Sequence, residues 1–481
     1  MEKNIKSGES RAKAFQILKQ DYLWDVVIIG GGAAGASLAV DAASRGFSTL
    51  LLESQDFCKG TATASELLMP DFSLLRCPRN WKRLRTQFQE RRLLLGNAPQ
   101  VTEKKQLILP FFKSAQREAW LAMLAAMNLS APSGTSLGGL RWMSGTEVIR
   151  RLPSVKPVDL KGGVQTEAVF VKPTELALSL LKTADMRGAV VLNHTEVTEV
   201  KRGEKGEIAA LTARDAVNGE EYTVRCRMVF NAAETEVDEV RRKVDAGARS
   251  ILSFYEQEHI TVDSKCFDGE RAALFADGLS RMPFECTPSD GVVTMGGMVR
   301  TGVAAEGDEE KKDTSRLLER ARQVLLFAPV ESNVKALIRT KKAFFNKNCG
   351  GKVRADLTEK AVFVPEFKNM ISVVGGCRLE CRRVAEDAMH EAVEQGLIYK
   401  RPCGTTFLSL YRLKQFDRAA ICREALEADS APQSLIDFAE HAVSDEFACS
   451  AEDIALRRLP TEKFGAQAVE HLVKLLKNCG F

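Results

Sequence analysis

The stretch of this sequence that most constrains the fold runs over residues 24–53 and reads WDVVIIGGGAAGASLAVDAASRGFSTLLLE. Its short apolar runs at residues 25–29 and 48–52 predict two buried parallel strands. Residues 33–45 between them predict a helix, which ends because Gly46 is a stop signal. A glycine turn precedes the helix and an acid follows the second strand. This order predicts a dinucleotide-binding unit and disfavours a chance glycine turn.

Three glycines of this unit, Gly30, Gly32 and Gly35, stand at the positions of a G-x-G-x-x-G motif. Gly30 permits the tight turn, Gly32 leaves room for a pyrophosphate, and Gly35 lets the helix pack close to the strand. We expect the first helical amides, around Ala34, to face the phosphates. Glu53, at the end of the second strand, can accept hydrogen bonds from a ribose diol and would repel a 2′-phosphate. These residues predict an adenine dinucleotide site.

Residues 53–65 continue as ESQDFCKGTATAS, an acid followed by a D-F pair and a Gly-Thr run. This run, together with residues 41–46 (DAASRG), resembles the FAD-dependent glycerol-3-phosphate dehydrogenase family, in which an acid and a D-F or D-L pair precede G-T-S-S-x-S. Further segments follow the family's order and spacing, namely residues 90–98 (ERRLLLGNA), 107–110, 145–153, 161–164, 229–233 (VFNAA), 373–388 (VVGGCRLECRRVAEDA) and 441–458 (HAVSDEFACSAEDIALRR). The resemblance covers most of the chain.

The resemblance implies an α/β fold in which an FAD domain of the two-dinucleotide-binding-fold type is interleaved with an antiparallel β-sheet substrate domain. A small helical C-terminal domain is expected to follow. We expect a polar lead-in over residues 1–23, an oxidoreductase region over residues 24–400 and the helical domain over residues 401–481. Locally, the sequence pattern predicts a helix at residues 331–338 and a β-hairpin that turns at Asn218-Gly219. The FAD-binding segments are expected at about residues 24–75, 160–235 and 350–396, with the substrate-domain segments between them.

The resemblance also implies that FAD is held without a covalent link. Residues 60–65 form a small polar loop that can lie against the pyrophosphate and the isoalloxazine ring. The glycine pair at residues 375–376 precedes a helix whose positive end can stabilise an anionic reduced flavin. Val197 is expected beside the adenine. Besides the glycine turn and Glu53, the expected cofactor contacts are Ser54, Gly60, Thr61, Ser65, Val197, Ala232, Ala233, Gly375 and Gly376.

On the substrate side the sequence departs from the family pattern. Family members carry H-G-G-x-R-Y, whose histidine serves the proton or hydride chemistry and whose arginine grips the substrate phosphate. Pro70 stands here at the histidine position and Leu74 at the arginine position. Leu67 and Cys377 replace family lysines, and a further arginine is lost near Val364. A phosphate dianion needs several converging cations or amides, so we expect poor activity on glycerol 3-phosphate.

Two candidates for the chemistry remain. His259, in EQEHITV, matches the histidine of the family's K-G-S-H strand and is the candidate base. Arg354, in GGKVRAD, matches the arginine of S-G-V-R-P-L and is the candidate anion anchor. Arg382 also matches a family arginine, and we expect a structural role for it as readily as a role at the substrate site. Cys381 is expected to pack at a helix start beside the flavin.

The resemblance implies an FAD-dependent oxidoreductase that takes a hydride from a secondary alcohol to flavin N5 and passes electrons to a quinone or another acceptor. A flavin-binding but catalytically silent structural or regulatory subunit is the alternative favoured by the lost substrate motif. An FAD enzyme with a changed substrate is a third interpretation. The retained cofactor residues favour the first.

Length, charge and cysteine content limit the number of domains, the binding partners and the compartment that we expect. The 481 residues predict two or three domains, and the net charge of +4 is too small to imply nucleic-acid binding. The 12 cysteines show neither zinc-type pairs nor a disulfide framework, so we predict no metal site and a reducing compartment. No run is long enough to span a bilayer, which favours a cytoplasmic location. The basic residues 76–92 are compatible with peripheral contact with a membrane. Composition does not determine the oligomeric state.

Overall fold

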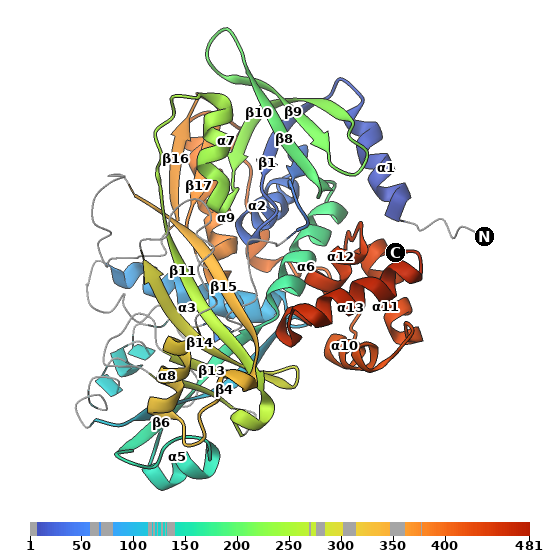
Figure 1. Ribbon diagram of the computed structural model, residues 1–481. Helices are drawn as coiled ribbons and strands as arrows, with labels where there is room; N and C mark the ends of the chain where they lie inside the picture. The colour runs from blue at the N-terminus through green and yellow to red at the C-terminus, as the bar shows by residue number, and fades with distance from the viewer. Residues whose placement is uncertain are drawn as a thin grey trace.

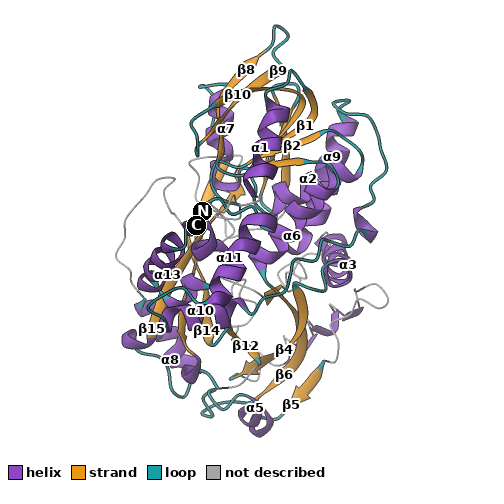
Figure 2. Cartoon of the chain, turned by 90° about the vertical axis from the view of Figure 1, so that its right-hand side faces the viewer, coloured by secondary structure: helices purple, strands orange, loops and turns teal. Residues whose placement is uncertain are grey.

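The computed structural model (Figure 1) describes residues 7–57, 67–68, 80–113, 140–268, 271–275, 284–301, 314–346, 361–376 and 378–481, and scattered positions between 118 and 131. Within these ranges the strands form two sheets. The two sheets lie at opposite ends of the molecule in both views (Figures 1 and 2). The chain crosses between them several times, so both sheets are built from segments distant in sequence.

The first sheet carries the predicted dinucleotide-binding unit. Its described strands follow the order β16-β17-β10-β1-β2-β7, with β9 paired to β10 and β8 paired to β9. The central strands β17, β10, β1, β2 and β7 run parallel to one another, as their continuous apolar runs predict, whereas β16 and β9 are antiparallel to β17 and β10. The strand bounds are β1 (Leu23–Ile29), β2 (Thr49–Leu52), β7 (Val190–Leu192), β8 (Thr195–Arg202), β9 (Ile208–Asp215), β10 (Glu221–Asn231), β16 (Val362–Glu366) and β17 (Met370–Val374).

The helix that follows the glycine turn, α2 (Ala33–Ser44), packs between the first sheet and two other helices, α6 (Pro173–Met186) and α9 (Cys381–Glu394). Its small side chains Ala36, Ala39 and Ala42 are fully buried, which allows all three helices to approach closely. The opposite face of the sheet is covered by α1 (Ser7–Leu18), α7 (Val237–Val244) and the β8–β9 pair. Among the described residues, a pocket opens at the carboxyl ends of β1, β2 and β10.

The second sheet comes mainly from the middle of the chain. Its described strands follow the order β15-β11-β14-β13-β12-β4-β6-β3, with β5 beside β6. All described pairs are antiparallel except β12 with β4, which agrees with the expected antiparallel substrate sheet. The bounds are β3 (Leu67–Leu68), β4 (Thr102–Phe111), β5 (Arg141–Met143), β6 (Gly162–Val171), β11 (Leu252–Asp263), β12 (Ala272–Phe275), β13 (Phe284–Ser289), β14 (Val292–Thr301) and β15 (Val334–Phe345).

The prediction of a helix over residues 331–338 is wrong. Glu331–Asn333 forms one 3₁₀ turn, and the chain then continues as strand β15. This strand pairs with β11 along almost its whole length, from Val334 opposite Val262 to Phe345 opposite Leu252. Pairing with a distant strand overrides the local helical pattern, because burial and cross-strand contacts decide the conformation of such a segment.

The C-terminal part is helical, as expected, and packs beside both sheets (Figure 1). Its own apolar core is built around Phe438, Leu435 and Leu472, which are fully buried. The α/β class, the interleaved antiparallel sheet and the small helical C-terminal part are thus confirmed. The remaining helices are α3 (Trp81–Asn97), α5 (Gly145–Arg151), α8 (Ser315–Val324), α10 (Arg418–Glu427), α11 (Gln433–Asp445), α12 (Ala451–Asp453) and α13 (Ala466–Asn478).

Candidate functional site

The glycine turn is shaped by close backbone contacts. Gly30 has φ +108°, and a Cβ atom added to it would lie 2.5 Å from the carbonyl oxygen of Ala232. A Cβ atom on Gly35 would lie 1.9 Å from the carbonyl oxygen of Gly30. Glycine is therefore required at both positions for α2 to leave the end of β1 at this angle.

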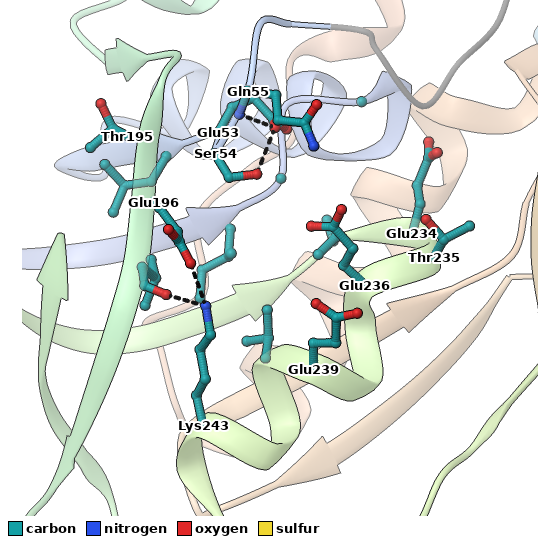
Figure 3. Close-up of a pocket in the computed structure, with 18 residues that line it drawn as sticks. Glu53, Ser54, Gln55, Thr195, Glu196, Glu234, Thr235, Glu236, Glu239 and Lys243 are labelled. Carbon is teal, nitrogen blue, oxygen red and sulfur yellow. Dashed lines mark hydrogen bonds and ion pairs between the residues drawn. The ribbon is translucent and has the colours of Figure 1, made fainter. Parts of the chain in front are cut away.

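A cavity of about 530 Å³ opens at the carboxyl ends of β1, β2 and β10 (Figure 3). We call it the nucleotide cleft, because ligands of parallel α/β sheets bind at this edge. Ala34 lies in the first turn of α2, and Gly35 packs behind the turn. The predicted cofactor residues that line the cleft are Gly30, Gly32, Glu53, Ser54, Val197, Ala232 and Ala233.

Glu53 is fixed at the mouth of β2 by backbone amides. Its Oε2 atom accepts a hydrogen bond from the Gly31 amide at 2.7 Å, and its Oε1 atom accepts one from the Gln55 amide at 2.9 Å. Burial raises the pKa of the Glu53 carboxyl above its ordinary value, while the two amides oppose that shift. The two amides thus fix the orientation of the Glu53 carboxylate at the end of β2.

The opposite wall of the cleft is acidic, which the sequence reasoning missed. Glu234 and Glu236 lie in the 3₁₀ turn η3 (Glu234–Glu236), and Glu239 follows on α7 (Figure 3). Lys243 Nζ lies on the same helix, where it donates to Glu196 Oε1 at 3.0 Å and to the Val197 carbonyl at 2.6 Å. The sequence signal for this wall is the run E-T-E directly after the small residues that end β10.

Among the described residues, the predicted cofactor residues Gly375 and Gly376 do not line the nucleotide cleft. Gly375 and Gly376 follow β17 with φ values of +77° and +101°, and α9 begins after a 3₁₀ turn at Arg378–Glu380. Cys381 opens α9 and is buried, and its burial raises the pKa of its thiol, which suits packing rather than redox chemistry. The predicted residues Gly60, Thr61, Ser65, Pro70, Leu74, Arg354 and Cys377 lie outside the described residues.

His259, the candidate base, lies on the second sheet. Strands β11, β14 and β13 place His259, Gly296 and Glu285 in one row across the sheet. Gly296 has no side chain, so the side chains of its two neighbours meet over it, with His259 Nε2 3.3 Å from Glu285 Oε1. A Cβ atom on Gly296 would lie 3.0 Å from the imidazole ring. A glycine inside a strand signals such a close approach, and this was the sequence clue to Glu285.

The His259 ring is fully buried, and neither of its nitrogens has a hydrogen-bond partner among the described residues. The hydroxyl of Thr287, two positions along β13 from Glu285, also lacks one within the described parts of the chain. Buried polar atoms normally have hydrogen-bond partners. The atoms of His259 and Thr287 on this face of the second sheet are therefore candidates to contact a ligand.

Two positions where the family carries cations can be placed. Leu67 lies in β3, half-buried beside the apolar cluster of Leu84 and Phe88. Val364 lies in β16, where it pairs with Ser372. Both side chains are apolar and fit their local surroundings. Arg382 forms ion pairs with Glu90 and Glu386 and so contributes to packing between helices. These contacts agree with the structural role considered for this residue.

The C-terminal helices are tied to the edge of the nucleotide cleft. Asp56 follows the cleft residue Gln55 and pairs with the fully buried Arg458. His194, in the turn between β7 and β8, lies 3.0 Å from Asp453 through its Nε2 atom. Its hydrogen bond to Asp453 raises the pKa of His194, with burial opposing. His194 thus helps to dock the C-terminal helices against the turn between β7 and β8.

Cys449 completes a potential metal-ligand trio with His194 and Asp453, whose ligand atoms lie within 4.8 Å of one another. The carboxylate of Asp453 already accepts a hydrogen bond from the Cys449 amide at 2.8 Å. Arg458 and Arg11 add positive charge next to the trio. This charge and these contacts favour a docking role for the trio over a metal role.

Comparison with known proteins fits this geometry. The model of the FAD dependent oxidoreductase family matches residues 25–345. The chain belongs to the FAD dependent oxidoreductase family. Its cofactor is FAD, as the glycine turn and Glu53 predict. The lining of the nucleotide cleft includes Glu53 and Val197, the residues predicted to contact the adenosine half of FAD, together with the acidic wall.

Individual relatives point the same way. Aerobic glycerol-3-phosphate dehydrogenase from Staphylococcus haemolyticus is 30% identical over 262 residues, which is 53% of this chain and 46% of that protein. The match therefore spans about half the length of this relative.

Solved structures share the fold. The glycerol-3-phosphate dehydrogenase from Bacillus halodurans complexed with FAD has a TM-score of 0.74 at 19% identity, covering 99% of this chain and 93% of that chain. The L-alpha-glycerophosphate oxidase from Mycoplasma pneumoniae with FAD bound has a TM-score of 0.65 at 14% identity, covering 82% of this chain and 100% of that chain. None of the described helices combines the length and the apolar character needed to cross a membrane.

Proposed function

We propose that this protein is an FAD-dependent oxidoreductase that oxidises a secondary alcohol less anionic than glycerol 3-phosphate. The observation that carries the proposal is His259, a buried histidine without a hydrogen-bond partner among the described residues, on the sheet expected to bind substrate. Bound FAD supplies a hydride acceptor at flavin N5. Electrons then pass to a quinone or another acceptor, as the family resemblance implies.

His259 would take the proton of the substrate hydroxyl as the hydride leaves. Proton removal by a positioned base is worth roughly a hundredfold or more in rate. Glu285, 3.3 Å from Nε2, stabilises the positive charge that the ring gains in that step. The pair thus combines a base, His259, with a carboxylate, Glu285, that orients it.

The charges around this histidine favour a substrate without a phosphate dianion. Glu285 places a carboxylate beside the base, and Leu67 provides an apolar side chain where the family has a lysine. Of the cations that the family resemblance assigns to the substrate phosphate, the sequence retains Arg354 and replaces the others noted above. These features support the changed-substrate form of the proposed function, with His259 as base and Arg354 as a polar anchor for a substrate less anionic than glycerol 3-phosphate.

A catalytically silent, flavin-binding subunit is the second candidate. The replacement of the family histidine and arginine by Pro70 and Leu74 favours it. The two candidates differ in whether any alcohol reduces the bound flavin through His259.

We further infer that contact with a membrane, where an acceptor quinone would reside, is peripheral. Of the basic residues on α3, Lys82, Arg85 and Arg92 are exposed, whereas Arg83 pairs with Glu380 at 2.7 Å. Such a small exposed basic group supports a weak, salt-sensitive contact with anionic lipid.

The test is flavin reduction by candidate alcohols in wild type and in His259→Gln, measured under anaerobic conditions by loss of flavin absorbance. We expect at least one uncharged secondary alcohol to reduce the wild-type flavin, and the variant to do so about a hundredfold more slowly at equal FAD affinity. His390→Gln, at an exposed histidine on α9, is the matched control and should behave as wild type. Failure of every alcohol with FAD bound would favour the silent subunit.

A further inference from the structure

Glu234 stands at the phosphate end of the nucleotide cleft. It directly follows Ala233 and has φ +47°, a left-handed conformation that few non-glycine residues adopt. A Cβ atom added to Gly32 would lie 2.6 Å from Glu234 Oε1, and its three nearest atoms would all belong to Glu234. The Glu234 carboxylate therefore lies against the glycine that a pyrophosphate is expected to approach.

Gly32 is also the N-cap of α2, a helix with no acidic residue in its first turn and no side-chain cap. The amides at such a helix start carry partial positive charge and favour an anion. The Glu234 carboxylate lies beside this helix start, against Gly32. Gly32 is the position at which the pyrophosphate of FAD is expected.

The rest of the described lining adds negative charge. Glu236 and Glu239 extend the acidic wall, and the influence of Glu236 on Glu53 contributes to the raised pKa of the Glu53 carboxyl, after burial. Lys243, the one cation of the described lining, is engaged by Glu196 at 3.0 Å. A diphosphate entering this cleft therefore approaches the carboxylates of this wall, with that of Glu234 nearest to Gly32.

We propose that Glu234 is an internal anion that competes with the pyrophosphate, so that phosphate-bearing ligands bind only when this side chain swings away from Gly32. The inference rests on the proposed FAD site. The displacement is feasible because the contact is made by the far end of a flexible side chain and not by backbone. The consequence is that Glu234 lowers the affinity for FAD and ADP but leaves the affinity for adenosine unchanged.

The test compares wild type with Glu234→Gln, which keeps the size of the side chain and removes its charge. Isothermal titration calorimetry with FAD, ADP and adenosine gives three dissociation constants for each protein. We expect the variant to bind FAD and ADP roughly ten- to a hundredfold more tightly, and adenosine equally, because the neutral amide no longer repels the phosphates. Glu239→Gln removes one charge from the same wall away from Gly32 and should give a smaller gain.

Three results would overturn the proposal. Equal affinities of wild type and Glu234→Gln for FAD and ADP would show that Glu234 does not compete, while leaving the FAD site itself intact. A gain for adenosine as large as that for ADP would show that the effect is not directed at the phosphates. If neither protein binds any of the three probes, the proposed function falls together with this inference.

Discussion

The guanidinium of Arg458 and the carboxylate of Asp56 form a buried ion pair across 402 residues of sequence, with Arg458 Nη2 2.9 Å from Asp56 Oδ1. Asp56 lies three residues after Glu53, and Arg458 ends the π-helical turn Ile454–Arg458 in the C-terminal part. The pair therefore joins the C-terminal helices to the loop that holds one wall of the nucleotide cleft. Disturbing it should affect both stability and cofactor binding.

Arg458→Met should lower the free energy of unfolding by about 3–5 kcal/mol, because it leaves the Asp56 carboxylate buried without its partner. The double variant with Asp56→Asn should regain part of this loss. Urea unfolding of the three proteins measures the change. A single variant as stable as wild type would show that the pair does not hold the C-terminal helices in place.

The stability of the protein should fall as pH rises through the neutral range, because of His194. Its hydrogen bond to Asp453 raises the pKa of the folded-state imidazole above its unfolded value of about 6.5. The stabilisation is therefore complete below the unfolded pKa and is lost as pH rises through the folded pKa. Urea midpoints of His194→Asn should lack this component, whereas those of His390→Asn should keep it. Parallel pH profiles for wild type and His194→Asn would contradict the assignment.

Substitutions in the glycine turn should distinguish effects on folding from effects on cofactor binding. Gly35→Ala should destabilise the fold, because the new Cβ atom would lie 1.9 Å from the Gly30 carbonyl oxygen. Gly32→Val should leave the thermal midpoint nearly unchanged and abolish FAD binding, since the three atoms nearest to the new Cβ all belong to the flexible side chain of Glu234. Gly96→Ala, where the new Cβ meets nothing within 4 Å, is the control for both. Tight FAD binding by Gly32→Val would place the phosphates elsewhere.

Glu285→Gln should slow flavin reduction by the productive alcohol by roughly tenfold to a hundredfold without changing FAD affinity. The amide cannot balance the charge that His259 gains, so the pH dependence of the rate should shift as well. Stopped-flow traces over a range of pH values measure both effects. A variant with a slower rate but the wild-type pH profile would assign Glu285 to packing alone.

Local patterns made the first part of this structure predictable. The βαβ unit around Gly30, Gly32 and Gly35 follows from residues adjacent in sequence, and so does the hairpin that turns at Asn218-Gly219. Apolar runs identified the parallel strands because those strands are buried on both faces. These features depend on the backbone within about one supersecondary unit.

Other features depend on residues that the fold brings together. Strand β15 exists because it pairs with β11, and its own sequence is compatible with a helix. The contact of His259 with Glu285 requires three strands in register over Gly296. The contact of Glu234 with Gly32 joins two chain segments that were each recognised only for their glycines and small residues. Spacing along the chain does not identify the partners in such contacts, even where a glycine or an acidic run marks one side of them.

The central claim is that the chain is an FAD enzyme whose substrate site no longer suits glycerol 3-phosphate. The most direct measurement mixes the FAD-loaded wild-type protein anaerobically with glycerol 3-phosphate and, separately, with uncharged secondary alcohols, and follows flavin absorbance by stopped flow. We predict bleaching by at least one uncharged alcohol and far slower bleaching by glycerol 3-phosphate. Rapid, saturable bleaching by glycerol 3-phosphate would contradict the account.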